Sequence, residues 1–389
     1  MKNQTTQLTT ARLVPPSTWA LLIGAWAVVG LFFAFGGNWL AAPIAPVVAG
    51  LVFVGLFVTI LAASFGVVHE ADHLAHQLGE PYGTLILTLS IVSIEVILIA
   101  SVFLGVGEFP TIGRDSIFAV MMIILNLVMG ICLIAGAARN GDQEYNAQGA
   151  VTYLSMIVLL TGIALVLPTF TSGAGEFTTT QAIGASVLTA VLYAAFLWKQ
   201  MSHYRRLFIQ PQQGSMAIAD MSARGAGTDG HSGGKPIDRR AMGVRSIVLL
   251  ALILPIVLLA HYLAVVTDYG IAAMGAPAAV GGVLIAIIVF TPESITAVKA
   301  AMHNEMQRAI NLCLGAFVST VGLTVPAVLV IGLVTGKQVI MGLSLMEIVL
   351  FALTMALTMQ TFNGQRTSSI QGFMHLTLFV IFGLLLFNP

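Results

Sequence analysis

The amino-acid sequence predicts an all-α polytopic membrane protein with about eleven transmembrane helices. Of its 389 residues, 58% are hydrophobic and only 8% are charged, whereas roughly a quarter of the residues are charged in an ordinary soluble domain. Apolar stretches of about 20 residues, enough to cross a hydrocarbon core of about 30 Å, recur from Trp19 to the C-terminus. A soluble fold of this length would leave much apolar surface in water, so the bilayer is the expected solvent.

The expected spans can be placed by residue number. They cover 18–36, 41–66, 83–105, 117–138, 150–168, 180–200, 245–266, 278–300, 309–334, 339–359 and 370–388. The stretch before the first span is polar and is not followed by a small-residue cleavage site, so we expect this span to be retained. Cys132 and Cys313 both fall inside apolar spans, where we expect small core residues rather than a disulfide or a soft-metal ligand set.

The distribution of charge predicts the orientation. If the N-terminus is cytoplasmic, 14 of the 16 basic residues fall on the cytoplasmic side, and only Arg114 and Lys337 fall outside. Such an asymmetry follows the positive-inside rule and supports the number of spans. We therefore expect a bacterial cytoplasmic (inner) membrane protein with its N-terminus inside and its C-terminus outside. A formal net charge of zero argues against a nucleic-acid partner.

The chain divides into four predicted parts. Residues 1–40 form a tail and an extra transmembrane helix, 41–201 a first five-helix repeat, and 245–389 a second five-helix repeat. Between the repeats, residues 202–244 are rich in Gly, Ser, Gln and charged residues, which is typical of a flexible cytoplasmic linker. Two blocks of five spans are the arrangement expected of an internally duplicated transporter.

The two repeats correspond best around one glutamate in each. Gly83 precedes Glu95 by twelve residues, and Gly281 precedes Glu293 by twelve. An odd number of spans separates the two segments, so they cross the membrane in opposite directions and form an inverted repeat. Twelve helical residues rise about 18 Å, which places each glutamate near the middle of the bilayer.

An acidic residue at the centre of a span costs about 2.5 to 3.5 kcal/mol and usually marks an ion pathway or a proton relay. No Lys or Arg shares the expected depth of Glu95 and Glu293, which disfavours the alternative of a structural ion pair or a helix-helix hydrogen bond. Burial and mutual repulsion favour protonation until a hard cation displaces the protons. The pair is therefore expected to bind cation or protons in turn.

Oxygen atoms near the glutamates are the expected supporting ligands, because hard cations such as Ca²⁺ prefer oxygen. Ser93 and Thr291 each precede a glutamate by two residues, and Pro292 frees backbone carbonyls of the preceding turn. The other candidates are Thr88, Asn126 and Thr320. For Asn126 and Thr320, an interhelical hydrogen bond is an equally plausible role.

Several segments resemble the bacterial calcium/proton antiporters of the cation/calcium exchanger superfamily. They are Ala71 to Ser90 with Glu95, Thr291-Pro-Glu293, Gln307 to Leu312, Val321 to Pro326, Arg114-Asp115-Ser116, His261, Arg366-Thr367 and His375-Leu376. The resemblance covers nearly the whole chain. It implies an eleven-span fold in which Glu95 and Glu293 bind the transported cation or protons, with sliding helices that give alternating access.

A rival interpretation is an intramembrane zinc protease, because His69-Glu70-Ala-Asp-His73 fits the H-E-x-x-H pattern. A second interpretation is a titratable collar in which Asp72, His76 and Glu80, with Glu70 and His73, gather cations or sense pH at the cytoplasmic side. A solvated helix end without such a role fits the same residues equally well. Glu347 is a third acidic residue in an expected span. It could line the route by which cations reach the site from the periplasm, or it could have a structural role.

The sequence thus predicts a secondary transporter rather than an enzyme, with no cofactor and with the lipid bilayer as its surroundings. Exchange of Ca²⁺ for protons is the expected activity, because one divalent ion replacing two protons leaves the local charge unchanged. Exchange of Na⁺ or K⁺ for protons on the same scaffold is the alternative. A channel with the same glutamates is the nearer rival among transporters, but inverted repeats favour alternating access.

Overall fold

The computed structural model describes residues 14–41, 43–78, 82–105, 109–171, 173–202, 204–211, 239–364 and 366–388. For residues 76, 82–85, 87 and 239 the description covers the backbone alone. In these ranges the regular structure is helical, and the only strand-like features are two isolated bridges. The predicted all-α fold is therefore confirmed.

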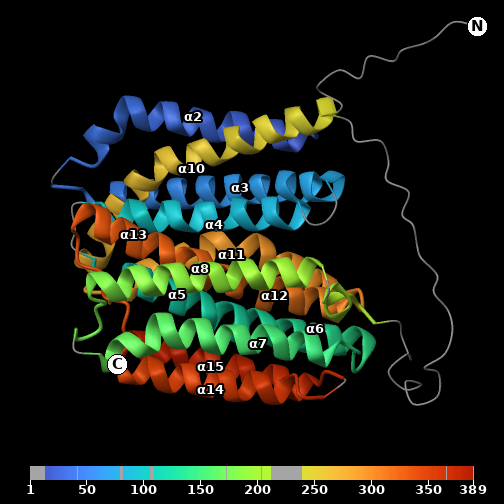
Figure 1. Cartoon of the computed structure of the whole chain (residues 1–389). Coiled ribbons are helices and arrows are strands. Elements are labelled where there is room, and N and C mark those ends of the chain that lie inside the picture. The colour runs from blue at the N-terminus through green and yellow to red at the C-terminus, as the bar shows by residue number, and fades with distance from the viewer. Residues whose placement is uncertain are drawn as a thin grey trace, which may run out of the picture. The chain divides into compact units, whose positions relative to one another are not determined.

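Eleven long helical segments make up the described chain, as the sequence predicts (Figure 1). They are α2 (Pro16–Trp39), α3 (Pro46–Leu78), α4 (Tyr82–Phe103), α5–η1–α6 (Ile112–Met122, Ile123–Val128, Met129–Asn140), α7–η2–η3 (Ala147–Thr161, Gly162–Val166, Leu167–Phe170), α8 (Thr179–Met201), α10 (Arg239–Met274), α11 (Ala279–Met302), α12–η5–α13 (Met306–Ser319, Thr320–Thr324, Val325–Thr335), α14 (Leu345–Thr361) and α15 (Ser369–Phe387). Nine are long and apolar enough to cross a membrane by themselves, and Thr88–Phe103 and Leu345–Thr361 are shorter apolar helices.

Two spans begin later than predicted, for local reasons. The second helix begins at Pro46 rather than at residue 41, because proline is favoured in the first turn of a helix and disfavoured further in. The tenth begins at Leu345 rather than at 339. Gly336 ends α13 in a left-handed conformation, and Ser344 starts α14 with a reciprocal capping box to Glu347.

Contacts divide the chain into two compact units that are not its two sequential halves. Unit 1 comprises residues 1–101 and 230–270, and unit 2 comprises residues 102–229 and 271–389. Unit 1 therefore combines α2, α3 and nearly all of α4 from the first part of the chain with α10 from the second.

Within unit 1, α2 and α3 pack against each other and against α10. The indole of Trp26 donates a 3.0 Å hydrogen bond to the carbonyl of Ala251. Gly66 of α3 lies so close to Leu252 of α10 that an added Cβ would approach a methyl group to 3.0 Å. Because glycine lacks a side chain, the two long helices approach closely at this point.

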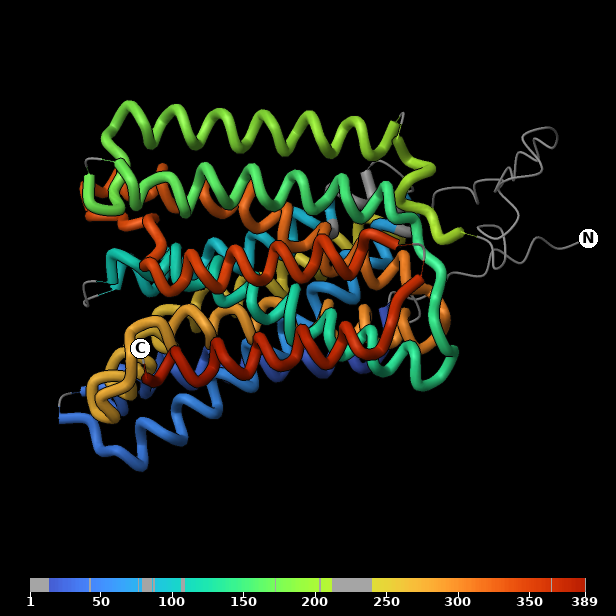
Figure 2. Tube along the Cα trace, turned by 90° about the horizontal axis from the view of Figure 1, so that it is seen from below, coloured from blue at the N-terminus to red at the C-terminus, as the bar shows by residue number. Residues whose placement is uncertain are grey.

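In unit 2, α11 is the central helix, packed against α5, α6 and α12. Around it, α15 lies on α6 and η1, and α8 lies on α13. Figure 2 shows α7 and α8 side by side, where the rings of Tyr153 and Phe196 lie 5.6 Å apart.

The helices of unit 2 have two distinguishable ends. At the first, which we call the basic end, lie Arg139, Lys199, Arg205, Arg206, Lys299, Arg308 and Arg366. Its loops are joined by the bridge between Glu144 and Arg366. The opposite end, which we call the Arg114 end, is joined by the bridge between Glu176 and Ile340 and by the hydrogen bond from Ile340 to Pro110.

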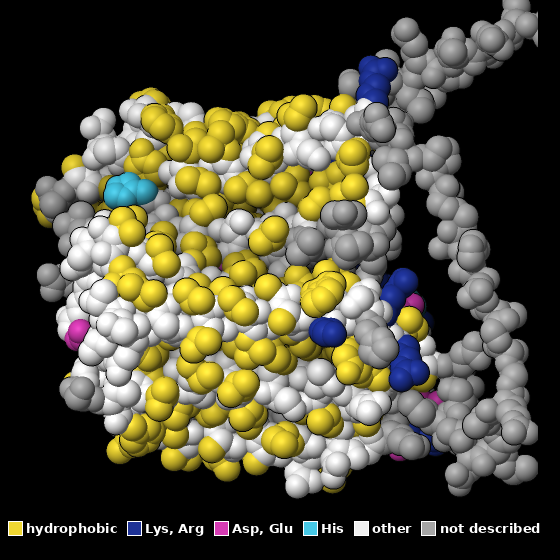
Figure 3. All heavy atoms as spheres, viewed as in Figure 1, with side chains coloured by type: hydrophobic (Ala, Val, Ile, Leu, Met, Phe, Trp, Pro, Cys, Tyr) yellow, Lys and Arg dark blue, Asp and Glu magenta, His cyan; other side chains and the backbone are white. Residues whose placement is uncertain are grey.

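Large apolar side chains remain exposed on the flanks of the helices, as Figure 3 shows. Examples are Leu51, Val334 and Ile370, with exposed fractions of 72%, 80% and 62%. Soluble monomers rarely expose contiguous apolar surface on this scale. The exposed flanks are therefore those of an integral membrane protein, in contact with lipid.

Candidate cation and proton site

Glu95 lies in α4 of unit 1 and is fully buried. It follows Tyr82, the first residue of the helix, by thirteen residues, a rise of about 20 Å. Thr88 precedes it by seven residues, close to two full turns, so both lie on one face of α4. Ile91, Val92 and Ile99 lie on the same side of α4 and are also buried.

Glu293 occupies a matching place in α11 of unit 2. It follows Ala279 by fourteen residues, a rise of about 21 Å, and its Oε2 atom is buried. Pro292 lies inside the helix immediately before it. Because proline has no N–H, it leaves a carbonyl of the preceding turn without its helical donor. Each glutamate is thus set deep within an apolar helix of its own unit.

The two cysteines are both buried and free. Cys132 lies in α6 and Cys313 in α12, and α12 packs against both α6 and α11. The sequence predicted small core residues rather than a disulfide, in agreement with this placement. Helix α12 therefore lies against both α6 and the helix that carries Glu293.

Two spans change from α-helix to π-helix in their middle third, a feature with no sequence signal. In the fourth span η1 covers Ile123–Val128, and in the ninth η5 covers Thr320–Thr324. A π-helix shifts the backbone hydrogen bonds by one residue, and such segments occur frequently at functional sites. Segment η1 lies against α11, so one of them borders the helix that carries Glu293.

Asn126 and Thr320, two predicted supporting residues, lie in these π-helices and are fully buried. The amide of Asn126 is used within a polar cluster: Nδ2 donates to Thr354 at 3.0 Å, and Oδ1 lies 3.1 Å from Nδ1 of His375. The other ring nitrogen of His375 lies 3.0 Å from the Thr361 hydroxyl. The structure therefore directs Asn126 toward α14 and α15, which is the interhelical alternative left open by the sequence.

The cluster continues to the basic end of unit 2. The hydroxyl of Tyr145, in the loop between α6 and α7, donates to the carbonyl of Thr361 at 3.3 Å. Burial raises the pKa of Tyr145 to about 12. The phenol is therefore neutral and a hydrogen-bond donor throughout the physiological range.

Ser93 and Thr291 are not on the faces of the helices that carry the glutamates. Residues two apart on a helix point in nearly opposite directions. Ser93 is exposed, and its hydroxyl donates to Leu89 of its own helix at 2.6 Å. Thr291 likewise donates to Ile287 at 2.5 Å. The hydroxyl residues beside the glutamates are thus bound to their own backbones, whereas Thr88 shares the face of Glu95.

Glu70, the acid of the H-E-x-x-H pattern, forms a buried ion pair rather than a metal site. Its Oε2 lies 2.8 Å from Nη1 of Arg245, and its Oε1 accepts from Thr18 at 3.2 Å. The carboxylate joins α2, α3 and α10, which leaves it unsuited to act as the general base of a protease. Among the described residues, no group of three or more His, Cys, Asp or Glu side chains is placed to hold a metal ion.

The predicted titratable collar is only partly described. Glu70 is fully buried and therefore does not belong to an exposed collar. His69 and His73 lie edge to face, with ring centroids 4.6 Å apart, and Asp72 is half-buried. Glu80 and the side chain of His76 lie outside the described residues.

Glu347 lies at the Arg114 end of unit 2, beside a second acid. Its Oε2 accepts from the backbone N–H of Ser344 at 2.8 Å, which completes the capping box of α14. It also lines a cavity of about 180 Å³ together with Arg114 and Asp115. Asp115 pairs with Arg114 at 2.9 Å. Glu347 therefore combines a structural cap with a place in a charged cavity.

The chain is similar to known proteins along most of its length. The family described as "Sodium/calcium exchanger protein" matches residues 48–201 and again residues 245–388. The y4hA protein of Sinorhizobium fredii is 33% identical over 326 residues, covering 83% of this chain and 85% of that protein. The sodium-potassium/proton antiporter ChaA of Escherichia coli is 31% identical over 368 residues, covering 95% of this chain and 96% of ChaA.

Among solved structures, that of native YfkE superposes with a TM-score of 0.71 at 19% identity, covering 95% of this chain and all of YfkE. This likeness confirms the fold. Since the family matches most of the chain, once on each side of the linker, the protein belongs to the sodium/calcium exchanger family, within the cation/calcium exchanger superfamily that the sequence motifs indicate.

Proposed function

We propose that the protein is a secondary cation/proton antiporter that exchanges Ca²⁺ for protons by alternating access. Glu95 and Glu293 bind the cation and the protons in turn. The observation that carries this proposal is the matching depth of the two glutamates in α4 and α11, on helices that the family matches separately. A carboxylate buried this deeply in an apolar helix favours a proton or a cation as its partner.

Charge balance supports calcium. Two protonated carboxylates and two carboxylates bound to one divalent ion carry the same net charge, so either state can exist in an apolar site. Bound metal also requires deprotonated ligands, so binding releases protons. Thr88 and the carbonyls near Pro292 are the supporting oxygens that we assign to the site. Thr320 is a further candidate, because it lies in η5.

A monovalent substrate is the second candidate, because ChaA, a relative along nearly the whole chain, is named a sodium-potassium/proton antiporter. The same carboxylates would then exchange one proton for one Na⁺ or K⁺ at each step. Carboxylate and hydroxyl oxygens accept all three ions. The flux measurement below distinguishes the three cations.

We further propose that the protein lies in a bacterial cytoplasmic membrane with its N-terminus inside and its C-terminus outside. In unit 2, the basic end would face the cytoplasm, since seven of its described Lys and Arg residues lie there and Arg114 and Lys337 lie opposite. The linker of residues 202–244 would be cytoplasmic.

The test is the collapse of a preformed pH gradient in proteoliposomes on addition of Ca²⁺, Na⁺ or K⁺. Wild-type protein is compared with Glu95→Gln and Glu293→Gln, which keep the side-chain shape and remove the titratable charge. Glu305→Gln is the matched control, since Glu305 is an exposed acid paired with Arg308 outside the site. Collapse with Ca²⁺ that is lost in both site variants and retained in the control supports the proposal.

Three other outcomes of the flux measurement have different meanings. Collapse with Na⁺ or K⁺ alone retains the mechanism and changes the substrate. Conduction of the cation without proton movement would favour a channel. No response to any cation would contradict the proposed transport and leave the family assignment without an activity.

A further inference from the structure

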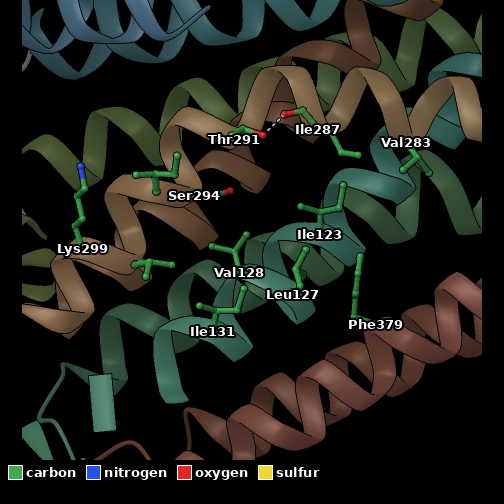
Figure 4. A pocket seen from close by; sticks show the side chains of 12 residues that line it. Ile123, Leu127, Val128, Ile131, Val283, Ile287, Thr291, Ser294, Lys299 and Phe379 are labelled. Atoms are coloured by element: carbon green, nitrogen blue, oxygen red, sulfur yellow. Dashed lines mark hydrogen bonds between the residues drawn. The ribbon is translucent and has the colours of Figure 1, made fainter. Parts of the chain in front are cut away.

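An apolar groove runs along α11 in unit 2, between that helix, α15 and the segment η1–α6. Its volume is about 500 Å³, which is within the range of ligand-binding pockets. Figure 4 shows Val283 at one end and Lys299 at the other, with Ile131 and Phe379 on facing helices. Sixteen residues of α11 separate Val283 from Lys299, a rise of about 24 Å. The groove is therefore long and apolar.

The hydroxyl groups in the groove are already bound. Thr291 donates to the carbonyl of Ile287, and Ser294 donates to that of Phe290 at 2.6 Å. Each bond satisfies the hydroxyl within its own helix, so these residues offer mainly methyl and methylene surface to an occupant. A polar solute would lose its hydration there without compensation, whereas a hydrocarbon chain would not.

The groove opens toward the surface of the protein. Ile131, Ile287 and Ile295 in its walls have exposed fractions of 37%, 36% and 40%. In a membrane protein, this surface is in contact with lipid tails rather than water. An acyl chain can therefore enter the groove from the side.

One end of the groove carries positive charge. Lys299 lies in the last turn of α11, and Arg139 lies in the last turn of α6, the opposite wall. The two helix ends are joined by Asn140, whose Nδ2 donates to the carbonyls of Ala301 and Met302 at 3.2 and 3.1 Å. Lys299 thus lines the groove itself, and Arg139 lies beyond the groove lining, in the last turn of the helix that forms the facing wall.

Neither of these cations has a carboxylate partner among the described residues, whereas the nearby Arg308 and Arg366 pair with Glu305 and Glu144. Two cations near helix C-termini at a membrane surface attract the phosphate of an anionic lipid. Charge and apolar length together select a molecule with a phosphate at one end and a hydrocarbon chain at the other.

We propose that this groove binds one anionic phospholipid, with an acyl chain along α11 and its phosphate between Lys299 and Arg139. Thr291 and Glu293 are two residues apart, so the lipid contacts the side of α11 roughly opposite the glutamate. The bound chain fills the space between α11 and α6 and holds the glutamate-bearing helix in place. Lipid binding at this groove goes beyond cation exchange and does not depend on which cation is transported.

Native mass spectrometry of the full-length protein in detergent tests the inference. Phosphatidylglycerol and phosphatidylcholine with the same acyl chains are titrated separately. We expect one retained phosphatidylglycerol per chain, with weaker retention of phosphatidylcholine. Removing each cation should weaken phosphatidylglycerol binding about fivefold, and the Arg139→Gln/Lys299→Gln double variant about 25-fold.

Two matched controls address the headgroup and the acyl chain. Lys199→Gln removes a basic residue from the last turn of α8, away from the groove, and should leave binding unchanged. Ile131→Phe fills the groove and should reduce binding of the lipid, whereas Ile183→Phe on the exposed face of α8 should not. None of these three substitutions changes a proposed cation ligand.

Equal retention of the two lipids would overturn the proposed headgroup selectivity. Undiminished binding by the double variant, or an equal loss in Lys199→Gln, would show that lipid binds elsewhere. Competition by glycerol 3-phosphate, which has no acyl chain, would indicate a phosphate site without the lipid groove and would also overturn the proposal.

Discussion

Glu70, Glu95 and Glu293 all lie in apolar helices, but their surroundings differ. Glu70 has a guanidinium at 2.8 Å and a hydroxyl at 3.2 Å, so its charge is neutralised permanently. Glu95 is fully buried in α4, and Glu293 follows a proline that breaks the regular hydrogen bonding of α11. The ion pair with Arg245 gives Glu70 a structural role. The depth of Glu95 and Glu293 within α4 and α11 is the basis of the transport role that we propose for them.

The ion pair between Glu70 and Arg245 predicts a large loss of stability when one partner is neutralised. Glu70→Gln leaves Arg245 with an uncompensated charge, and we expect the free energy of unfolding to fall by about 3 kcal/mol. Glu305→Gln removes the acid of an exposed pair, with side chains 43% and 53% exposed, and should cost at most about 0.5 kcal/mol. Reversible unfolding in mixed micelles measures both.

A double variant, Glu70→Gln/Arg245→Met, should recover part of that loss because no buried charge remains. Equal stability of Glu70→Gln and wild type would show that the pair is not formed in the membrane.

The two roles of Glu347 can be separated by two substitutions. Glutamine preserves the capping box, so Glu347→Gln should keep the stability of the protein. If the charge lines the cation route, this variant raises the cation concentration for half-maximal exchange from the Arg114 side. Glu347→Ala also removes the side-chain half of the capping box, the bond from the Ser344 N–H, and should cost about 0.5 to 1 kcal/mol. Proteoliposome flux and thermal unfolding measured on both variants make the comparison.

Unchanged half-saturation in Glu347→Gln together with destabilised Glu347→Ala would assign Glu347 to capping alone. The sequence identified this residue but could not show the cap, since the cap depends on where α14 begins. The same limit explains Ser93 and Thr291: proximity in sequence suggested shared ligation, whereas helix geometry turns residues two apart in nearly opposite directions.

At the scale of the elements, hydropathy is sufficient to predict all eleven helices. A long apolar segment in a bilayer must satisfy its backbone hydrogen bonds within itself, and a helix does so. The π-helices η1 and η5 could not be predicted, since they depend on hydrogen-bond register rather than on composition. The ion pair of Glu70 was also missed, because Arg245 is 175 residues away in sequence. Interhelical pairing of this kind has no periodic signal.

The crossing of α5 and α11 predicts opposite results for two neighbouring glycines. A Cβ on Gly282 would lie 2.6 Å from the backbone N of Ser116 and 2.7 Å from the carbonyl carbon of Asp115. A Cβ on Gly281 would meet only side-chain methyl groups, at 3.5 Å or more. We expect Gly282→Ala to lower stability by about 1 to 3 kcal/mol, because the backbones must separate, and Gly281→Ala to be tolerated.

Thermal unfolding and exchange rate, measured side by side on the two alanine variants, check this difference. Similar behaviour of both would mean that α5 and α11 cross at another position or at a greater separation.

At the scale of the whole molecule, sequence repeats and contact units divide the chain differently. The family matches the chain on either side of the linker, whereas unit 1 draws α10 from the second half. The sequence could not predict that α10 packs with the first helices of the chain. A repeat shows which segments are similar, but it does not show which segments pack together. Each unit receives one of the two glutamates.

The orientation of the whole chain is predicted by its basic residues. Alkaline phosphatase fused after Pro389 should be active, because it is carried to the outside. The same enzyme inserted in the linker near Met221 should be inactive, and a fluorescent protein at each position should give the reverse pattern. Activity at both sites would contradict the five spans after the linker, and activity at the linker alone would contradict the proposed orientation.

Proton release on cation binding tests the central claim most directly. Purified protein in weakly buffered detergent solution receives Ca²⁺, and a pH indicator records the protons released per ion bound. We predict about two protons for the wild type near neutral pH, fewer for Glu95→Gln and Glu293→Gln, and no change for Glu305→Gln. Calcium binding without proton release, or release unaffected by both glutamine variants, would contradict the assignment of Glu95 and Glu293 as the exchanging site.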